Sequence, residues 1–402
     1  MSYDNSQLAR VYLHAWQVTG NEFFRTITEE ILGYVMREMV DPGGGFYSTQ
    51  DADSEGEEGK FFVWTPDEIR EVLGSDADEF MAAYGVTRHG NFEGKNIVEF
   101  VGDIDQRPTL AEARSKLFEA REKRVHPGRD EKVLTSWNGL MLAAFAEAAR
   151  VLGREDYQEV AERNAEFLLR ELRQENGRLL RSWKDGEAKL NGYLEDYSHL
   201  IEGLLELYQT SFDAQWFVVA QQLADTMIKH FSDSEGVLYD TSDDHQMLIT
   251  RPRDLQDNAT PSGNAMAVTA LLKLAGFTNG FRYVDIAHQA LAQMQPTMSQ
   301  YPLGFGQWLQ ALAYALSKPR EIAIVGDPDS ADTQALLSVV RDGYRPFQVV
   351  ALGAPSDQPP AVPLLQDRGL VDGGAAVYVC RNYVCQAPVT TPQALELLLN
   401  TR

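Results

Sequence analysis

Hydrophobic residues follow two alternating helical patterns along most of the chain. One kind of segment is apolar nearly all round, as in 140–149, LMLAAFAEAA. The segment after it, 157–170, carries one apolar stripe among many charged residues, and 200–205 differs from 218–228 in the same way. A helix that is apolar all round is buried, whereas a striped helix has one solvated face. The pattern therefore predicts helical hairpins with an inner first helix and an outer second helix.

A fixed spacing indicates that these hairpins are repeats. Fifteen residues separate a polar helix start from the turn that ends the helix in four segments: Asn5 to Gly20, Asn138 to Gly153, Tyr197 to Phe212 and Asn264 to Asn279. A second offset of 40 or 41 residues leads to the glycine-led, strand-like segments 45–47, 177–179 and 236–239. Repeated hairpins pack side by side into an α/α toroid or solenoid. Because the helices of a hairpin are antiparallel, we expect the inner-helix amino ends to meet at one rim.

The repeat is interrupted once and later ends. Residues 60–135 break the spacing with a helix start at Pro66 and a charged helix over 110–125. After Leu316 the sequence predicts strands over 321–325, 347–352 and 375–380, a helix over 333–341 and a last helix from Pro392. We therefore predict a mainly α chain: a toroid over 1–318, with the insertion at about 60–135, and a small α/β module over 319–402.

The composition excludes some classes of binding partner. The 402 residues include 59 acidic and 36 basic side chains, a net charge of -23 that repels nucleic acid and anionic membranes. No apolar run approaches the roughly 18 residues of a membrane-spanning helix, and residues 1–5 lack the features of a secretory signal, so we expect a cytoplasmic location. Cys380 and Cys385 are the two cysteines. In that compartment we expect them to be reduced and packed.

The inner-helix starts carry the strongest candidate ligand-binding set. Carboxylates and carboxamides can hydrogen-bond hydroxyl groups, and aromatic rings offer flat apolar faces, a mixture suited to a neutral polyhydroxylated ligand such as a sugar. Helix capping is the alternative for each polar residue, because capping also places Asp and Asn at helix starts. The set comprises Asp4, Asn5, Trp137, Asn138, Tyr197 and Asn264, together with Asp196.

Candidate acid/base groups come from the same rim and from the acidic loop 51–58, which lies between the expected strands 46–49 and 60–64. Glycoside cleavage needs two carboxyl groups, and we predict Asp51 or Asp53 paired with Asp196. A solvated acidic turn is the alternative for that loop. An epimerase would instead need a base of near-neutral pKa, for which His199, one turn into the third inner helix, is the candidate. A buried helix histidine is the alternative there.

The sequence predicts neither a metal site nor a cofactor. The acidic loop resembles a calcium loop at Asp51, Asp53 and Glu55, but Phe62 stands at the twelfth position, where a bidentate Glu belongs. No His and Cys cluster lies on the predicted toroid, which disfavours zinc. Residues 326–330 follow a strand without the glycine pattern of a phosphate-binding loop.

Four motifs give the chain a resemblance to a known family: 44–54, GGFYSTQDADS; 134–140, LTSWNGL; 258–264, NATPSGN; and 380–388, CRNYVCQAP. They resemble the YyaL/spermatogenesis-associated protein 20 family. The resemblance implies a thioredoxin-like domain followed by a six-hairpin toroid similar to those of glycosidases and N-acylglucosamine 2-epimerases. This chain shows four hairpins and starts in the middle of that architecture, so we expect it to lack the thioredoxin-like part and two hairpins.

Two functions from different classes follow. The first is a carbohydrate-active enzyme, a glycoside hydrolase or sugar 2-epimerase, that works through acid/base carboxylates. The second is a non-catalytic binding or scaffolding module with a degenerate pocket, which the missing hairpins favour. Their absence would also expose apolar surface near residues 1–30, so we expect a homo-oligomer or a partner chain to cover the N-terminal hairpin.

Overall fold

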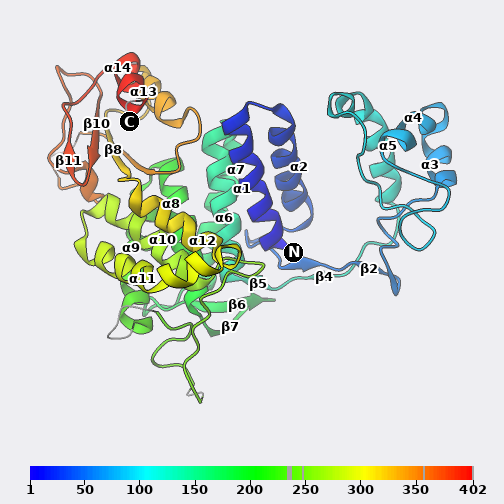
Figure 1. Ribbon diagram of the computed structural model, residues 1–402, viewed down its shortest axis with the longest axis horizontal. Coiled ribbons are helices and arrows are strands. Elements are labelled where there is room, and N and C mark those ends of the chain that lie inside the picture. Colours follow the sequence, from blue (N-terminus) through cyan, green and yellow to red (C-terminus); the bar gives the residue numbers. More distant parts are fainter. Residues whose placement is uncertain (233–237, 247–248, 356–357, 401–402) are drawn as a thin grey trace. The chain divides into compact units, whose positions relative to one another are not determined.

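The chain is mainly helical, as predicted, and falls into two compact units. The computed structural model describes all residues except 233–237, 247–248, 356–357 and 401–402 (Figure 1). One unit joins Met1–Ser48 to Glu131–Arg402, and the other is Thr49–Asp130. The predicted helical hairpins and the predicted α/β module both lie in the first unit.

Four helical hairpins in the described part of the chain form an inner and an outer layer, an incomplete α/α toroid (Figure 1). The inner helices are α1 (Ser2–Thr19), α6 (Thr135–Leu152), α8 (Leu194–Ser211) and α10 (Gly263–Thr278). The outer helices are α2 (Glu22–Glu38), α7 (Glu155–Glu171), α9 (Ala214–Phe231) and α11 (Phe281–Gln300). Another helix, α12 (Gly306–Leu316), packs against α10. Helices α6 and α8 are buried along nearly their whole length, which confirms the predicted inner layer.

The spacing of 15 residues corresponds to a repeated helix end. Each inner helix stops at a residue in the left-handed conformation, with φ of 67° at Gly20, 66° at Gly153, 56° at Phe212 and 55° at Asn279. A left-handed residue lets the last turn close its hydrogen bonds before the chain reverses. The second offset leads to isolated β-bridges, Val40 to Phe46, Arg173 to Leu179 and Ser232 to Leu238. Gly236, which we expected to open the third of these segments, lies outside the described residues.

The α/β module has the predicted strands and helices. Its described elements are β8 (Arg320–Val325), α13 (Ala331–Arg341), β9 (Gln348–Gly353), β10 (Ala376–Arg381), β11 (Val384–Cys385) and α14 (Pro392–Asn400). The sheet order is β11-β10-β8-β9, and only the β8–β9 pair is parallel. Its apolar residues, among them Ile322, Leu336 and Val377, form a core separate from that of the toroid. A domain boundary at residue 318 stays a prediction.

A three-stranded sheet joins the second and third hairpins. It consists of β5 (Val133–Leu134), β6 (Leu180–Lys184) and β7 (Glu187–Asn191). All the strand pairs in it are antiparallel. The chain leaves this sheet at β7 and enters inner helix α8, so the sheet lies directly before the start of that helix.

The second unit, Thr49–Asp130, has its own small core around Ile69, Phe80 and Leu117. Its elements are β1 (Thr49–Gln50), β2 (Asp53–Ser54), β3 (Glu57–Glu58), α3 (Pro66–Leu73), α4 (Ala77–Ala83), α5 (Ala111–Arg121) and β4 (Arg129–Asp130). The predicted helix start at Pro66 is confirmed. The predicted strands over 46–49 and 60–64 form only in part: β1 covers Thr49–Gln50, Phe46 and Trp64 make single β-bridges, and β2 pairs with β3 within the acidic loop.

The expectation of reduced cysteines is also wrong in this structure, where Cys380 and Cys385 form a disulfide. Strands β10 and β11 place the two residues directly opposite each other across a tight hairpin. Facing positions of such a hairpin bring the side chains together, whereas a continuous strand would separate them by about 16 Å.

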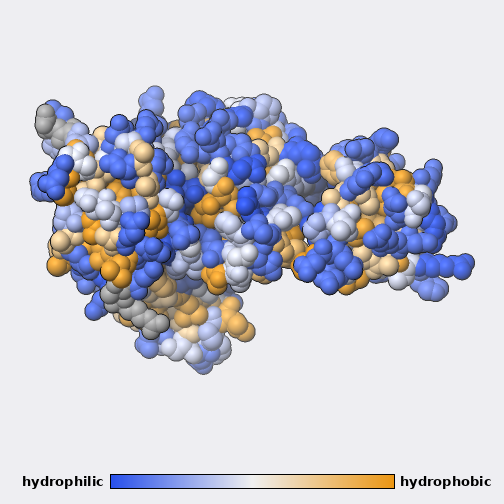
Figure 2. Space-filling view, turned by 90° about the horizontal axis from the view of Figure 1, so that it is seen from above, coloured by the Kyte–Doolittle hydropathy of each residue, from blue (hydrophilic) through white to orange (hydrophobic). Residues whose placement is uncertain are grey.

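Hydrophilic residues cover most of the face shown in Figure 2, and hydrophobic residues form smaller separate areas. This agrees with the strongly acidic composition. Among the helices of the described residues, none combines the length and apolar character required to cross a bilayer.

Candidate functional site

A cavity of about 690 Å³ lies between the inner helices of the first unit. Helices α1, α6, α8, α10 and α12 contribute to its walls, and the α/β module adds α13 and residues 343–350. Its volume is within the range of small-molecule sites, which are usually clefts of about 300–1,000 Å³. The aromatic residues Phe212, Tyr314, Tyr344 and Phe347 line it together with several glutamines. The cavity therefore combines flat apolar surfaces with hydrogen-bonding groups.

One position of the repeat supplies a charged or titratable side chain to this cavity from every inner helix. His14, Glu147, Glu206 and Lys273 each stand nine residues after the predicted helix-start residues Asn5, Asn138, Tyr197 and Asn264. All four line the cavity. None of the four was among the predicted site residues, although 140–149 contains a single charged residue within an otherwise apolar helix. A charge at a buried position is rare unless it is paired, so the interruption itself was the signal.

These side chains form a continuous ion-pair network. Arg10 Nε lies 2.7 Å from Glu147 Oε2, and His14 Nε2 lies 2.8 Å from Glu147 Oε1. Lys273 Nζ lies 2.8 Å from Glu202 Oε1 and 2.6 Å from Glu206 Oε1.

Arg150 closes the network by pairing with Glu206. The carboxylates of Glu202 and Glu206 are almost fully buried, with side-chain exposures of 3% and 4%. Two inner helices, α6 and α8, thus bring three carboxylates against cations from α1, α6 and α10.

Electrostatics keep the carboxylates of Glu147 and Glu206 ionised. Burial alone would raise the pKa of Glu147, but Arg10 and His14 outweigh it and hold that pKa well below the ordinary value. Burial likewise opposes ionisation of Glu206, yet Arg150 and Lys273 lower its pKa. The pKa of Lys273 is raised, because the attraction of Glu202 and Glu206 outweighs the effect of desolvation. Near neutral pH Glu147, Glu206 and Lys273 therefore carry fixed charges.

The predicted rim residues occupy the first turns of the inner helices, as expected, but none of them lines the cavity. Asn138 Oδ1 accepts from Phe46 N at 2.8 Å and from Asn164 Nδ2 at 2.9 Å. Asn138 Nδ2 donates to the carbonyls of Phe46 and Leu134, each at 2.9 Å. The Tyr197 hydroxyl accepts from Leu179 N at 2.9 Å. These two buried side chains tie α6 and α8 to the segments that follow the preceding outer helices α2 and α7.

The other predicted ligand-binding residues have different environments. Asn264 Oδ1 accepts from Leu238 N at 3.2 Å. Trp137 packs edge-on against Tyr3, with ring centroids 4.6 Å apart. Asn5 donates to the Met1 carbonyl at 2.9 Å, and Asp4 pairs with the Met1 amino group at 3.5 Å. Ligand binding by these residues stays a prediction.

The predicted acid/base groups separate into the two units. Asp196 is fully buried and accepts from Ser136 N at 3.0 Å and Tyr193 N at 2.8 Å, and its burial raises its pKa to about 7. His199 is also fully buried, and desolvation lowers its pKa. Asp51 and Asp53 are exposed residues of the Thr49–Asp130 unit. The pairing of Asp51 or Asp53 with Asp196 stays a prediction.

We expect Asn138→Ala to lower the free energy of unfolding by about 3 kcal/mol, because it leaves the buried N–H and C=O of Phe46 without partners. Chemical denaturation followed by circular dichroism measures the loss. Asn5→Ala, at the equivalent position of α1, removes an exposed bond and should change the stability by less than about 0.5 kcal/mol. Equal effects of the two substitutions would contradict the structural role of Asn138.

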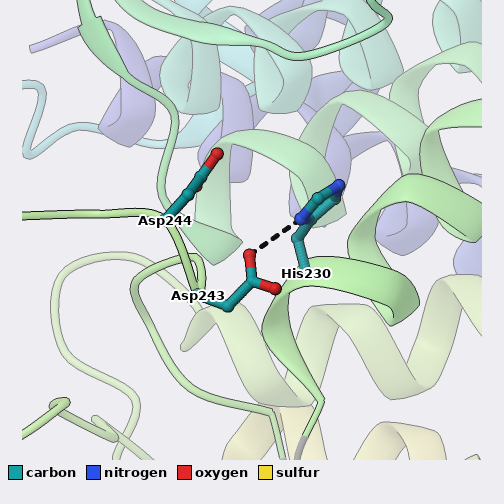
Figure 3. Close-up of side chains that lie close together, drawn as sticks. All are labelled: His230, Asp243 and Asp244. Carbon is teal, nitrogen blue, oxygen red and sulfur yellow. Dashed lines mark hydrogen bonds and ion pairs between the residues drawn. The ribbon is translucent and has the colours of Figure 1, made fainter.

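A second polar cluster lies at the end of α9 (Figure 3). Ligand atoms of His230, Asp243 and Asp244 are within 4.8 Å of one another, as in no other group of three or more His, Cys, Asp and Glu among the described residues. His230 Nδ1 lies 2.8 Å from Asp243 Oδ1. Arg178 holds both carboxylate oxygens of Asp244, at 2.7 and 2.8 Å. Protein side chains therefore already pair these groups.

Comparison with known proteins confirms the resemblance that the motifs indicated. Proteins named spermatogenesis-associated protein 20 from Homo sapiens and Rattus norvegicus are each 33% identical over 452 residues, covering 100% of this chain and 58% and 57% of theirs. An uncharacterized protein of Caenorhabditis elegans is 26% identical over 100% of this chain. The chain thus spans somewhat more than half the length of these relatives. No family model matches it.

Among solved structures, a sugar epimerase from a ruminal bacterium matches 73% of this chain and 75% of its own, with a TM-score of 0.41 and 11% identity. Cellobiose 2-epimerase from Bacillus thermoamylovorans matches 66% of this chain and 69% of its own, with a TM-score of 0.36 and 13% identity. Similarity at this level assigns neither a substrate nor a reaction to the present chain.

Proposed function

We propose that this chain binds a small polyhydroxylated ligand, such as a sugar, in the cavity between its inner helices. The observation that carries the proposal is the repeat position that brings His14, Glu147, Glu206 and Lys273 into one cavity. Fixed charges and amides can hydrogen-bond several hydroxyl groups at once, while aromatic walls cover the apolar face of a sugar ring. The cavity volume of about 690 Å³ is sufficient for such a ligand.

For the reaction we propose 2-epimerisation in preference to glycoside hydrolysis. Hydrolysis requires a protonated carboxyl group as the acid. The lowered pKa values of Glu147 and Glu206 argue against either residue in that role. Epimerisation requires a base that removes a proton beside a carbonyl, and His14 lines the cavity with Glu147 orienting its ring at 2.8 Å. His14 thus takes the place that we first gave to His199.

The test combines binding with proton exchange. Calorimetry against a panel of mono- and disaccharides should detect a ligand for the natural chain, and NMR in D₂O should show deuterium entering at C2 of that sugar. We expect His14→Asn to retain binding and to reduce exchange by at least about 100-fold. His288→Asn, which changes an exposed histidine of α11 outside the cavity, is the matched control.

The outcomes separate the candidate functions. Binding without exchange in the natural chain would support the non-catalytic binding module, which remains the alternative. Absence of binding by every sugar would contradict the proposed function. Loss of binding in Asp196→Asn or Trp137→Ala would instead indicate that the ligand binds at the predicted helix-start residues.

Two further expectations accompany this function. The first is a cytoplasmic location, for which cell fractionation is the test. The second is a homo-oligomer or partner chain over the N-terminal hairpin, supported by the exposure of Leu8 and Val18 on α1, at 49% and 65%. Light scattering of the purified chain should give a mass above the monomer's 45.0 kDa if the oligomer forms.

A further inference from the structure

The cavity has a positive excess although the chain as a whole carries a charge of -23. Among the described residues that line it, five arginines and lysines face three carboxylates. The cations are Arg10, Arg150, Lys273, Arg341 and Arg345, and the carboxylates are Glu147, Glu202 and Glu206. The ion-pair network uses the first three cations. The excess therefore comes from Arg341 and Arg345, which the α/β module contributes.

Arg341, the last residue of α13, is the more constrained of the two. Its Nη2 donates to the Thr210 carbonyl at 2.9 Å, and its guanidinium lies 5.6 Å from the centroid of the Phe212 ring. Its Nε is buried and has no hydrogen-bond partner, and no carboxylate pairs with it within the described residues. Arg345 Nη1 donates to the Val339 carbonyl at 3.2 Å and likewise has no carboxylate partner in that part of the chain.

An unpaired cation at this place is energetically unfavourable. Burial, together with repulsion from the nearby Arg150, lowers the pKa of Arg341 to about 10, so the group is still charged near neutral pH. Arg341 is half-buried, so holding its charge there without a counter-charge is unfavourable, and pairing with full hydrogen bonding would recover much of that cost. A guanidinium fork matches the oxygens of a carboxylate or a phosphate, and it can donate two parallel hydrogen bonds to either.

We propose that the α13 end of the cavity binds an oxyanion group, a carboxylate or phosphate, carried by the ligand, and that Arg341 is its principal anchor. This inference rests on the proposed function for the polyhydroxylated part of the ligand. It narrows the substrate class to sugar acids or sugar phosphates. The ion-pair network then contacts the hydroxyl groups, and Arg341 fixes the charged end.

Calorimetry with four probes tests the inference: glucose, glucuronate, glucose 6-phosphate and inorganic phosphate. We expect one of the anionic sugars to bind at least about tenfold more tightly than glucose, and the better of the two identifies the oxyanion as carboxylate or phosphate. Inorganic phosphate should raise the melting temperature of the natural chain. Both effects should weaken as the salt concentration rises.

Substitutions at Arg341 show whether that residue is the anchor. Arg341→Gln should remove the advantage of the anionic sugar and the response to phosphate while leaving the affinity for glucose unchanged. Arg341→Lys keeps the charge without the fork and should retain part of both effects. Arg282→Gln, in α11 and outside the cavity, should behave as the natural chain does. Circular dichroism confirms that each variant is folded.

The outcomes distinguish the two proposals. Equal affinity for glucose and both anionic sugars would overturn the oxyanion site and leave the proposed function standing. A phosphate response that depends on Arg341, without binding of any sugar, would support the oxyanion site and contradict the proposed function. No response to any of the four probes would overturn the oxyanion site, and failure of the whole saccharide panel would overturn the proposed function as well.

Discussion

Replacing Gly139 by Ala is expected to lower the free energy of unfolding by about 3 kcal/mol or more, because α6 and α8 touch through their backbones at this residue. A Cβ on Gly139 would lie 2.5 Å from His199 C, 2.6 Å from Leu200 N and 2.7 Å from His199 O. No side chain can rotate away to relieve these contacts. The two inner helices would have to move apart and loosen the core that they share. Urea denaturation followed by circular dichroism measures the effect.

Gly33→Ala is the matched control for that substitution. Gly33 lies within α2, and a Cβ there would meet no atom within 4 Å. Alanine in a helix interior is favoured over glycine by about 1 kcal/mol, so this variant should be more stable than the natural chain. If Gly139→Ala were also neutral or stabilising, the close packing of α6 against α8 would be wrong.

The hairpin layout could be predicted because the residues that favour each helix and its end locally are also the residues that the packed fold needs at those positions. A buried helix must be apolar all round, and an antiparallel return requires a left-handed residue at the helix end. Gly20, Gly153 and Asn279 meet this second requirement in the sequence itself. Phe212 adopts the left-handed conformation without being glycine or asparagine, with φ 56°. It was found only because it stands at the repeat spacing.

The predicted residues at the helix starts do not line the cavity, and polar residues at helix starts also have a structural role. Asn138 and Asp196 stand where backbone N–H groups are free, and both bond backbone N–H groups of segments that pack against these starts. Glu147 and Lys273 stand at mid-helix, where backbone groups are already paired, so their partners must come from other helices. Charge in the middle of an apolar helix is therefore the better indicator of the cavity.

Other parts of the site lay beyond sequence reasoning. The proximity of Arg341 to Arg150 depends on how the α/β module packs against the toroid, and no repeat or motif encodes that contact. The disulfide required the exact register of β10 and β11, which the sequence of the four residues between the two cysteines leaves open. Both features arise from long-range packing, whereas periodicity reports only on one element at a time.

Glu206→Gln should lower the free energy of unfolding by about 3–5 kcal/mol, because Glu206 is the carboxylate shared by Arg150 and Lys273. Glutamine is similar to glutamate in volume, so packing should change little. The loss of stability comes from Arg150 and Lys273, each of which loses one counter-charge. Chemical denaturation at pH 7 measures it. Glu187→Gln removes an exposed carboxylate 2.9 Å from Lys189 and should change the stability by less than about 1 kcal/mol.

The stabilisation that Glu206 provides should decrease at low pH. Because the pKa of Glu206 is lowered in the folded state, its contribution to stability is complete above the ordinary value of 4.5 and is lost as the pH falls below it. The natural chain and Glu206→Gln should therefore differ most near neutral pH and converge as the pH decreases from 4.5 towards the folded-state pKa of about 2. A second substitution, Lys273→Met, should cost less in the Glu206→Gln background than in the natural chain, since the cation has already lost a partner. A difference in the free energy of unfolding between the two chains that stayed constant from pH 7 to pH 3 would show that Glu206 acts through packing alone. The charge network would then have no part in holding α6, α8 and α10 around the cavity.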